Sequence, residues 1–456
     1  MNVFLHEGQP DIYRGFQRVL VIQHRTETAL EVAEQGRAKA FQHLLATHLA
    51  PEVNLPPWVD PPSIYEIKQI AKAENATLVS YSLLYDYNQF YQMSRFRLGF
   101  NYLYAYATDL YVWVVTPAGK VTFQQVDLQH LWHKKNTSIS AIVRSVRELI
   151  NVGESEAHSM SYREQLQFLY QLLIEPIADL LPKEQHHRVI IIPQDFLFLV
   201  PFAALIDCQG KYLIEKHTLS IAPAIQVLEW TNKLRKQQKP QKQQGENGHK
   251  ATRDSLIVAN PKMPQICLEF GEPPVQLLQL PRTETEAKAI GELLQTVPLT
   301  GDRATKAAVL EKLPTADIIH LATHTFLDDT EVLQCAIALA PSGKNNGLLT
   351  LGEILKLKLN AKLLVLSGCD ISRSHIWGDG IVALSRGFIA AGVPSLVMSL
   401  WLPHPGSNVK FMRQFYHHYQ QNGDKAKSLR MAMLDTMQAY PEPRHWAGFM
   451  LIGKPE

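Results

Sequence analysis

Two side chains capable of covalent chemistry, His324 and Cys369, each follow a short apolar run. His324 ends the segment Ile318-Ile-His-Leu-Ala-Thr-His, and Cys369 ends the segment Leu363-Leu-Val-Leu-Ser-Gly-Cys. A thiolate is the reactive form of cysteine, and an imidazole can take up the thiol proton and later protonate a leaving amine. Backbone N–H groups near Gly368 could stabilise the developing oxyanion. The pair therefore predicts a cysteine nucleophile with a histidine base, although a buried small side chain and a structural histidine fit the same pattern.

A metal site is the second chemistry that these residues suggest, because His320 and His324 form an H-x-x-x-H pair. Zinc peptidases carry a glutamate directly after the first histidine of a helical H-E-x-x-H motif. This chain has Leu321 there, and the segment has the pattern of a strand. We therefore expect His320 to belong to the core, and we expect neither a metal nor a cofactor.

The elements that must position the pair are short apolar runs separated by segments with helical spacing. After residue 254 the strands are predicted at 255–259, 317–322, 363–366, 395–401 and 448–452. Helices are predicted at 284–296, 305–313 and 380–391, and two more precede the last strand. This order predicts a parallel sheet with helices on both faces. Ligands bind beyond the carboxyl ends of the strands in such sheets, which is where His324 and Cys369 fall.

The part of the chain before residue 233 divides into a helical start and a mixed α/β region. Residues 1–50 have helical spacing, and from about residue 78 apolar runs at 110–115, 121–126 and 189–192 predict strands. A tract rich in Lys and Gln then predicts a flexible linker. The predicted organisation is a helical segment at 1–62, an α/β half at 63–232, a linker at 233–254 and a second α/β half at 255–456.

Composition excludes several classes of protein. The 456 residues are 46% hydrophobic with a net charge of +2, so the chain is neither disordered nor a general nucleic-acid binder. Four cysteines, at 208, 267, 335 and 369, are too few and too scattered for a disulfide framework. The sequence has neither a signal-peptide pattern at its start nor an apolar run long enough to span a membrane. We expect a cytoplasmic protein that does not bind membranes.

A cluster of aromatic residues raises one further alternative, because aromatic rings interleaved with Arg95 and Arg97 could stack nucleic-acid bases. A hairpin or an insertion packing on the first α/β half explains the same cluster. We favour this second interpretation and expect no nucleic-acid partner. The aromatic residues are Tyr81, Tyr85, Tyr87, Phe90, Tyr91, Phe96 and Phe100.

The run from about residue 78 to residue 454 resembles the CHAT domain, a caspase-like cysteine peptidase module of clan CD that is often attached to tetratricopeptide repeats. His324 precedes Cys369 by 45 residues, close to the separation of about 50 residues that is typical of caspases. Residues 29–45 also resemble the closing helix of a tetratricopeptide array. The segments that carry the resemblance are Pro193–Leu205, Leu299–Thr305, His320–His324, Leu366–Cys369, Gly378–Trp401 and His445–Gly453.

The resemblance implies a caspase-like three-layer α/β/α sandwich with a mainly parallel sheet, preceded by an inactive caspase-like half. It also implies a cysteine endopeptidase that cleaves protein or peptide substrates through a thioester acyl-enzyme. His324 and Cys369 would be the catalytic dyad, and the backbone amides of Thr325 and Cys369 would hold the oxyanion. A regulatory protein partner would bind through the N-terminal helices. The alternative is a weakly active or inactive scaffold in protein–protein signalling.

Substrate recognition is also implied by the resemblance. A substrate peptide would lie along the strand near Ser399 and Trp401 and pair with it as an added strand. Asp370 and Asp379 are further candidates for substrate binding, although Asp379 could instead cap a helix.

The sequence departs from the family pattern at three places. Where the family commonly has Ser-Ala-Cys followed by Thr-Gly, this chain has Ser367-Gly-Cys-Asp-Ile-Ser. Thr325 stands where the family usually has glycine, so a positive φ there would be strained. Where the family often has acidic residues after the tryptophan, this chain has Leu402-Pro-His-Pro-Gly, which carries no carboxylate.

Overall fold

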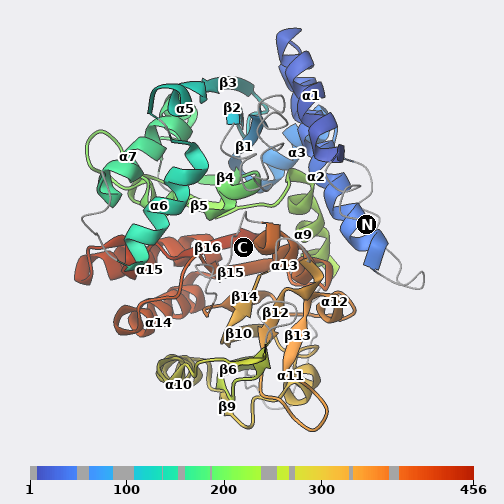
Figure 1. The fold of residues 1–456 in the computed structure, drawn as a ribbon, viewed down its shortest axis with the longest axis vertical. Coiled ribbons are helices and arrows are strands. Elements are labelled where there is room, and N and C mark those ends of the chain that lie inside the picture. Colours follow the sequence, from blue (N-terminus) through green and yellow to red (C-terminus); the bar gives the residue numbers. More distant parts are fainter. Residues whose placement is uncertain are drawn as a thin grey trace. The chain divides into compact units, whose positions relative to one another are not determined.

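The structure is a computed structural model that describes residues 8–48, 61–85, 107–135, 137–152, 160–184, 187–237, 254–266, 273–327, 332–368 and 379–456. The chain forms two compact units, Met1–Glu229 and Trp230–Glu456 (Figure 1). The helical segment predicted at 1–62 falls within the first unit. Of the predicted linker, residues 233–237 belong to helix α9, and residues 238–253 lie outside the described residues.

In the described part of the first unit, five strands lie in the order β3-β2-β1-β4-β5. Strands β3, β2 and β1 pair antiparallel, whereas β4 and β5 continue from β1 in parallel. Nearly every residue of β1 and β2 is buried, as expected for strands covered on both faces. The strands are β1 (Ala76–Tyr85), β2 (Ala107–Val115), β3 (Val121–Asp127), β4 (Arg188–Ile192) and β5 (Thr218–Ile221).

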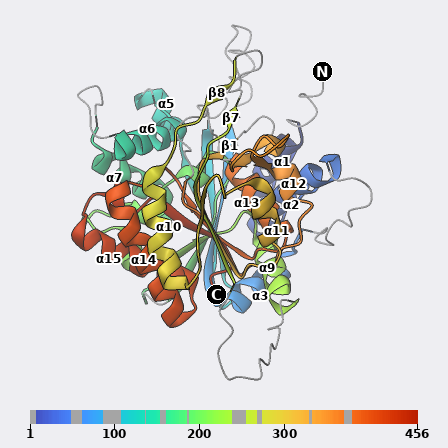
Figure 2. The same ribbon diagram turned by 90° about the horizontal axis from the view of Figure 1, so that it is seen from below.

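Helices cover both faces of this sheet, and the N-terminal helices are part of the covering (Figure 2). Leu20 and Leu30 are buried in the same apolar cluster as Ile67 and Trp113. The helices are α1 (Gly8–Ile22), α2 (Thr26–His48), α3 (Ile64–Glu74), α5 (Gln129–Lys135), α6 (Ile139–Val152), α7 (Tyr162–Leu173), α8 (Leu213–Lys216) and α9 (Ile225–Gln237). The described residues of this unit also include the 3-10 helices η3 (Glu175–Leu180), η4 (Asp195–Leu199) and η5 (Phe202–Ala204).

A buried polar cluster ties α2 to the rest of the first unit. The carboxylate of Glu34, which is fully buried, pairs with Arg37 at 2.6 Å and accepts from the backbone N–H of Ile225 at 2.6 Å. Arg37 also donates to the hydroxyl of Ser80 in β1 at 3.2 Å. One carboxylate therefore satisfies the first N–H of α9 and an arginine that reaches the sheet.

Among the described residues of the second unit, the main sheet has six strands in the order β16-β15-β14-β10-β6-β9. The five strands from β15 to β9 are parallel, and β16 pairs antiparallel with β15. The strands are β6 (Ser255–Pro261), β9 (Leu299–Gly301), β10 (Ile318–Ala322), β14 (Leu363–Leu366), β15 (Ser395–Ser399) and β16 (Phe449–Gly453). This is the predicted mainly parallel sheet, with one antiparallel strand at its end.

Three layers make up the second unit, because helices lie on both faces of its sheet (Figure 2). One face carries α10 (Pro281–Leu294), α14 (Pro405–Asn422) and α15 (Lys425–Ala439). The other carries α11 (Lys306–Lys312), α12 (Leu351–Ile354) and α13 (Asp379–Ala390). The described residues of this unit also form two 3-10 helices, η6 (Val332–Gln334) and η8 (Pro443–His445).

Two small sheets in the second unit were not predicted. Strands β11 (Thr325–Phe326), β12 (Ala336–Ala338) and β13 (Leu348–Thr350) form an antiparallel sheet directly after β10. Strands β7 (Gln265–Ile266) and β8 (Val275–Gln276) form a two-stranded pair. Strands of two or three residues carry no periodicity that a sequence pattern could reveal.

Candidate active site

His324 stands at the carboxyl end of the central strand β10, between β10 and β11. The preceding residue, Thr323, is fully buried, and its hydroxyl donates to the carbonyl of Ala338 at 2.8 Å. The carbonyl of His324 itself accepts from the N–H of Ala338 at 2.9 Å. Backbone and side-chain bonds to β12 therefore fix the turn that carries the imidazole.

The imidazole of His324 is largely buried and has two partners. Its Nε2 lies 2.9 Å from the backbone carbonyl of Leu278, and its ring stacks on Phe326 with a centroid distance of 6.4 Å. A carbonyl oxygen can only accept a hydrogen bond, so Nε2 carries the hydrogen in this contact. The Nδ1 atom of the neutral ring therefore holds the lone pair and is the nitrogen that can act as a base.

The segment leading to Cys369 ends beside the segment leading to His324, since β10 and β14 are parallel neighbours (Figure 1). Leu321 lies opposite Leu366, and the N–H of Ser367 donates to the carbonyl of Leu321 at 3.1 Å. A Cβ added to Gly368 would lie 2.1 Å from the carbonyl oxygen of Thr323. The chain directly before Cys369 is thus packed against the chain directly before His324.

Cys369 itself lies outside the described residues, as does Asp370. Asp379 is the first residue of α13, but its side chain is not described either. The predicted roles of these three residues therefore stay predictions.

Thr325 begins β11, and its φ is not positive, so the strain expected from a non-glycine residue does not arise. Because His324 and Ala338 form a hydrogen-bonded pair, the next pair, Thr325 and Ile337, is of the non-hydrogen-bonded kind. The N–H of Thr325 therefore points away from β12. It points to the outer edge of β11, the edge strand of its sheet, as an oxyanion donor would need.

Ser399 and Trp401 are both buried, at 0% and 2% exposure. Strand β15, which ends at Ser399, pairs with β14 on one side and β16 on the other, and the N–H of Leu400 donates to the carbonyl of Gly448. The indole of Trp401 donates to the carbonyl of Arg444 at 3.3 Å. A peptide could therefore add as a strand only beyond residue 400, because both edges of β15 itself are occupied.

His320 belongs to the core, as predicted, and is fully buried. Its Nε2 lies 3.0 Å from the carboxylate of Glu286, and its Nδ1 lies 3.0 Å from the hydroxyl of Tyr416. Asn408 donates to the other oxygen of Glu286 at 2.8 Å. Burial and the negative charge of Glu286 raise the pKa of Tyr416 well above its usual value, so its hydroxyl stays protonated. This network joins α10 and α14 to β10 just below the candidate site.

In the part of the chain that is described, neither another cysteine nor a group of metal ligands forms an alternative active site. Cys208 is exposed in the first unit and Cys335 is buried in the second, whereas Cys267 lies outside the described residues. The described side chains contain no group of three or more His, Cys, Asp or Glu residues that could hold a metal ion. Among the described helices, none is both long and apolar enough to cross a membrane.

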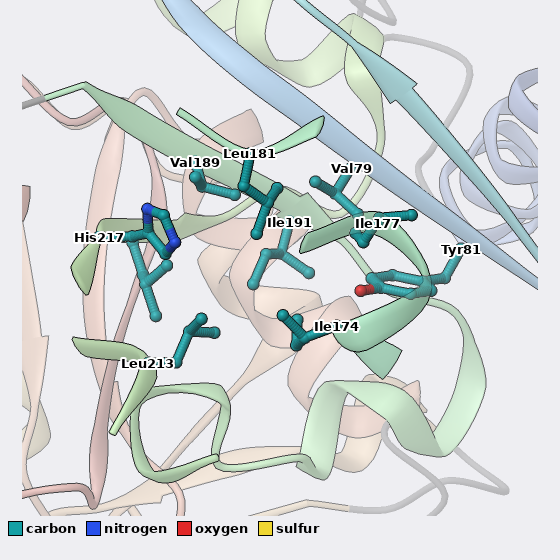
Figure 3. A pocket seen from close by; sticks show the side chains of 10 residues that line it. Val79, Tyr81, Ile174, Ile177, Leu181, Val189, Ile191, Leu213 and His217 are labelled. Carbon is teal, nitrogen blue, oxygen red and sulfur yellow. The ribbon is translucent and has the colours of Figure 1, made fainter. Parts of the chain in front are cut away.

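An apolar pocket in the first unit is the other feature that could suggest a ligand (Figure 3). Aliphatic side chains make up its lining except at two positions, and at one of these Tyr81 donates its hydroxyl to the carbonyl of Leu173. No cluster of reactive side chains lines the pocket, and we interpret it as part of the core. Its lining residues are Val79, Tyr81, Ile174, Ile177, Leu181, Val189, Ile191, Leu213, His217 and Leu219.

Tyr81 and Tyr85 also bear on the nucleic-acid alternative. Both are buried in β1, where Tyr85 donates to the carboxylate of Asp195 at 2.8 Å. Rings inside the core cannot stack on bases. The other aromatic residues of that predicted cluster, from Tyr87 to Phe100, lie outside the described residues.

Sequence reasoning missed the carbonyl of Leu278 and the ring of Phe326. A backbone carbonyl leaves no signal in the residue type, so the Leu278 contact could not have been predicted. Phe326 could have been noticed, because an aromatic residue two positions after a candidate base can stack on the imidazole.

Comparison with known proteins gives a family match and two curated relatives. Residues 163–454 match the CHAT domain. Tetratricopeptide repeat protein 28 of Mus musculus is 25% identical over 567 aligned positions, which cover 98% of this chain and 22% of that protein. The protein of the same name from Homo sapiens is 25% identical over 568 positions with the same coverage. The chain thus spans about a fifth of the length of these relatives.

Solved structures of the Saccharomyces cerevisiae separase–securin complex are similar in fold. One aligns with a TM-score of 0.54 at 10% identity and covers 99% of this chain and 36% of that chain. A second aligns with a TM-score of 0.51 at 11% identity and covers 95% and 34%. At this level of identity the likeness bears on the fold alone, which is caspase-like.

Proposed function

The chain belongs to the CHAT domain family, and we propose that it is a cysteine endopeptidase in which His324 and Cys369 form the catalytic dyad. One observation carries the proposal: the imidazole of His324 is held through Nε2 at the carboxyl end of β10, with Nδ1 left as a base. The neighbouring strand β14 leads to Gly368, the residue directly before Cys369, at the same carboxyl-terminal edge of the sheet.

The proposed reaction begins when His324 Nδ1 takes the proton of the Cys369 thiol. The sulfur then attacks the substrate carbonyl, and the oxyanion is stabilised by the N–H groups of Thr325 and Cys369. Collapse breaks the C–N bond, and the imidazolium protonates the leaving amine. Water attacks the resulting thioester, gives its proton to His324 and releases the acid with the thiol restored. No cofactor takes part in these steps.

Intact-mass labelling with a peptide-based electrophile tests this function. We expect the unmodified chain to be labelled once, at Cys369, and labelling to be lost in Cys369→Ala. In His324→Gln the rate should fall by about 100-fold or more, because the base that activates the thiol is missing. Cys208→Ala is the matched control, since it removes an exposed thiol from the first unit and should leave the rate unchanged.

Labelling spread over Cys208, Cys267 and Cys335 without preference for Cys369 would contradict the peptidase. The second candidate function, a scaffold that binds protein partners, would then account for the fold. A line of exposed apolar side chains on α1 favours it: Ile12, Phe16, Val19 and Ile22 are each about half exposed or more.

We infer that this apolar line on α1 binds a helical hairpin of the tetratricopeptide type. Repeats of this kind bury their apolar faces by stacking on a neighbouring hairpin. Helices α1 and α2 already form a helical hairpin, in which a Cβ at Gly36 would lie 3.3 Å from Tyr13. The curated relatives are named for this repeat. A partner bound here could regulate the peptidase or use the chain as a scaffold.

A further inference from the structure

Cationic and imidazole side chains gather near the candidate active site, on the loop after Trp401 and at the start of α10. The backbone places them there. Leu278, whose carbonyl binds His324, is four residues from Arg282 in the first turn of α10. His404 precedes α14, which packs against α10, and follows β15, the parallel neighbour of β14. Both side chains are exposed.

His404 is poised to donate a hydrogen bond at neutral pH. Its Nδ1 accepts from the N–H of Gly406 at 3.3 Å, so in the neutral ring the hydrogen is on Nε2. Partial burial, together with the positive charges of Arg444 and Arg282, lowers the pKa of His404. The starts of α10 and α14, which carry Arg282 and His404, lie side by side, because Asn408 in α14 donates to the carboxylate of Glu286 in α10 at 2.8 Å. In the described part of the chain Arg282 has no ion pair or hydrogen-bond partner.

The nearby carboxylates are already engaged. Glu442 pairs with Arg444 at 2.9 Å, and Glu284 accepts from Asn260 at 2.8 Å. Two exposed apolar side chains lie near the donors in sequence: Leu278, which is 67% exposed, precedes Arg282 by four residues, and Leu402, which is 37% exposed, precedes His404 by two. The surface thus offers an unpaired guanidinium, an imidazole N–H and an apolar border.

We propose that Arg282 and His404 form a subsite for a carboxylate side chain of the substrate, so that the preferred substrates are peptides with Asp or Glu near the scissile bond. This inference rests on the proposed peptidase function and names its substrate class. A guanidinium and an imidazole N–H can each donate to one carboxylate, whereas an amide of the same shape gains no ionic interaction. The loop carries no acidic residue that would instead select a basic side chain.

The test compares tetrapeptide chloromethyl ketones that carry Glu, Gln or Lys at each position in turn. At one position we expect the Glu probe to label Cys369 about fivefold faster than its Gln isostere, as for a partly exposed ion pair. Arg282→Glu should abolish this preference and favour the Lys probe at that position. Lys427→Glu makes the same kind of charge change at the far end of α14, after the turn into α15, and should keep the Glu preference.

Two further measurements separate failure of this inference from failure of the proposed function. Iodoacetamide has no peptide side chain, so its selective reaction with Cys369 reports the dyad alone. Binding of fluorescent amide versions of the peptides to Cys369→Ala, followed by anisotropy, reports the subsite without catalysis. Tighter binding of the Glu peptide that Arg282→Glu removes would support the subsite even if the dyad is inactive. Equal binding of Glu and Gln peptides, or a preference for Lys, would overturn it.

Discussion

Gly368 lies in close contact with the end of the neighbouring strand. A Cβ added there would lie 2.1 Å from the carbonyl oxygen of Thr323. Any side chain there would collide with the carbonyl oxygen and separate the ends of β10 and β14. These two ends lead to His324 and Cys369, so the absence of a side chain at Gly368 sets how closely the two residues can approach.

Replacing Gly368 by alanine should therefore impair the site more than a core substitution elsewhere. The added Cβ would lie 2.1 Å from the carbonyl oxygen of Thr323, and backbone atoms cannot move aside cheaply. We expect a loss of about 1–3 kcal/mol in the free energy of unfolding, measured with urea, and slower labelling of Cys369.

Gly352→Ala is the matched control for this substitution. Its nearest neighbour would be the hydroxyl of Thr350 at 4.0 Å, and it lies in a helix, where alanine is the better residue. The control should leave the labelling rate unchanged and stability equal or slightly higher. Equal effects of the two substitutions would contradict the role given to the Thr323 contact.

At the scale of elements, the sequence predicted the helices and strands with the longest patterns. The apolar runs at 317–322, 363–366 and 395–401 correspond to β10, β14 and β15. Strands such as β9 and β11 could not be predicted, since they have three residues or fewer and exist only through pairing with distant residues. The position of His324 beyond a strand was predictable, but the contact with Leu278 depends on how α10 packs.

Helix α1 shows how an element can be predicted while its environment cannot. Its buried face packs into the core through Leu20, whereas Ile12, Phe16 and Val19 are exposed along the adjoining side of the helix. A helix in contact only with its own unit would show polar residues on that exposed side. This second apolar face is the basis for the partner inferred above.

Phe16→Glu should abolish binding of a purified array of consensus tetratricopeptide repeats, measured by calorimetry. The substitution places a charge in the middle of the apolar line, where Phe16 is 50% exposed, so folding should be little affected. Gln23→Glu adds the same charge at an exposed position just after α1 and should still bind. If the unmodified chain failed to bind the array, or Phe16→Glu bound as well, this partner would be wrong.

For the molecule as a whole, the sequence predicted two α/β halves, and the structure has two compact units. The first unit includes the N-terminal helices because Leu20, Ala29 and Leu30 are buried with its sheet. Sequence spacing identified these helices, but only the packing joins them to the sheet. The net charge of +2 hides the local concentration of cations around His404 and His445, which lie 41 positions apart in sequence.

Those two histidines make the stability of the chain depend on pH. Their rings lie 4.6 Å apart, and the hydroxyl of Ser407 lies 3.0 Å from Nδ1 of His445. Burial lowers the pKa of each imidazole, and Arg444 and the other ring lower that of His445 further. Arg282, Glu442 and the ring of Tyr440 also face the pair, and Lys410 lies over that ring.

The sign of the effect follows from proton binding. Between the lowered pKa values of the folded state and the unfolded value of about 6.5, the unfolded chain binds more protons. Stability contributed by the neutral imidazoles is therefore fully present above pH 6.5 and is lost as the pH falls through this window. We expect the melting temperature to fall between pH 7.5 and pH 5.5, measured by calorimetry of the full chain.

The double variant His404→Gln, His445→Gln should show a smaller fall over the same range, since glutamine does not titrate. His187→Gln is the matched control, because His187 is a partly exposed histidine of the first unit whose ring lies 3.9 Å from the carboxylate of Glu184. It should retain the full pH dependence. An undiminished fall in the double variant would mean that other groups, such as carboxylates, govern the loss of stability in acid.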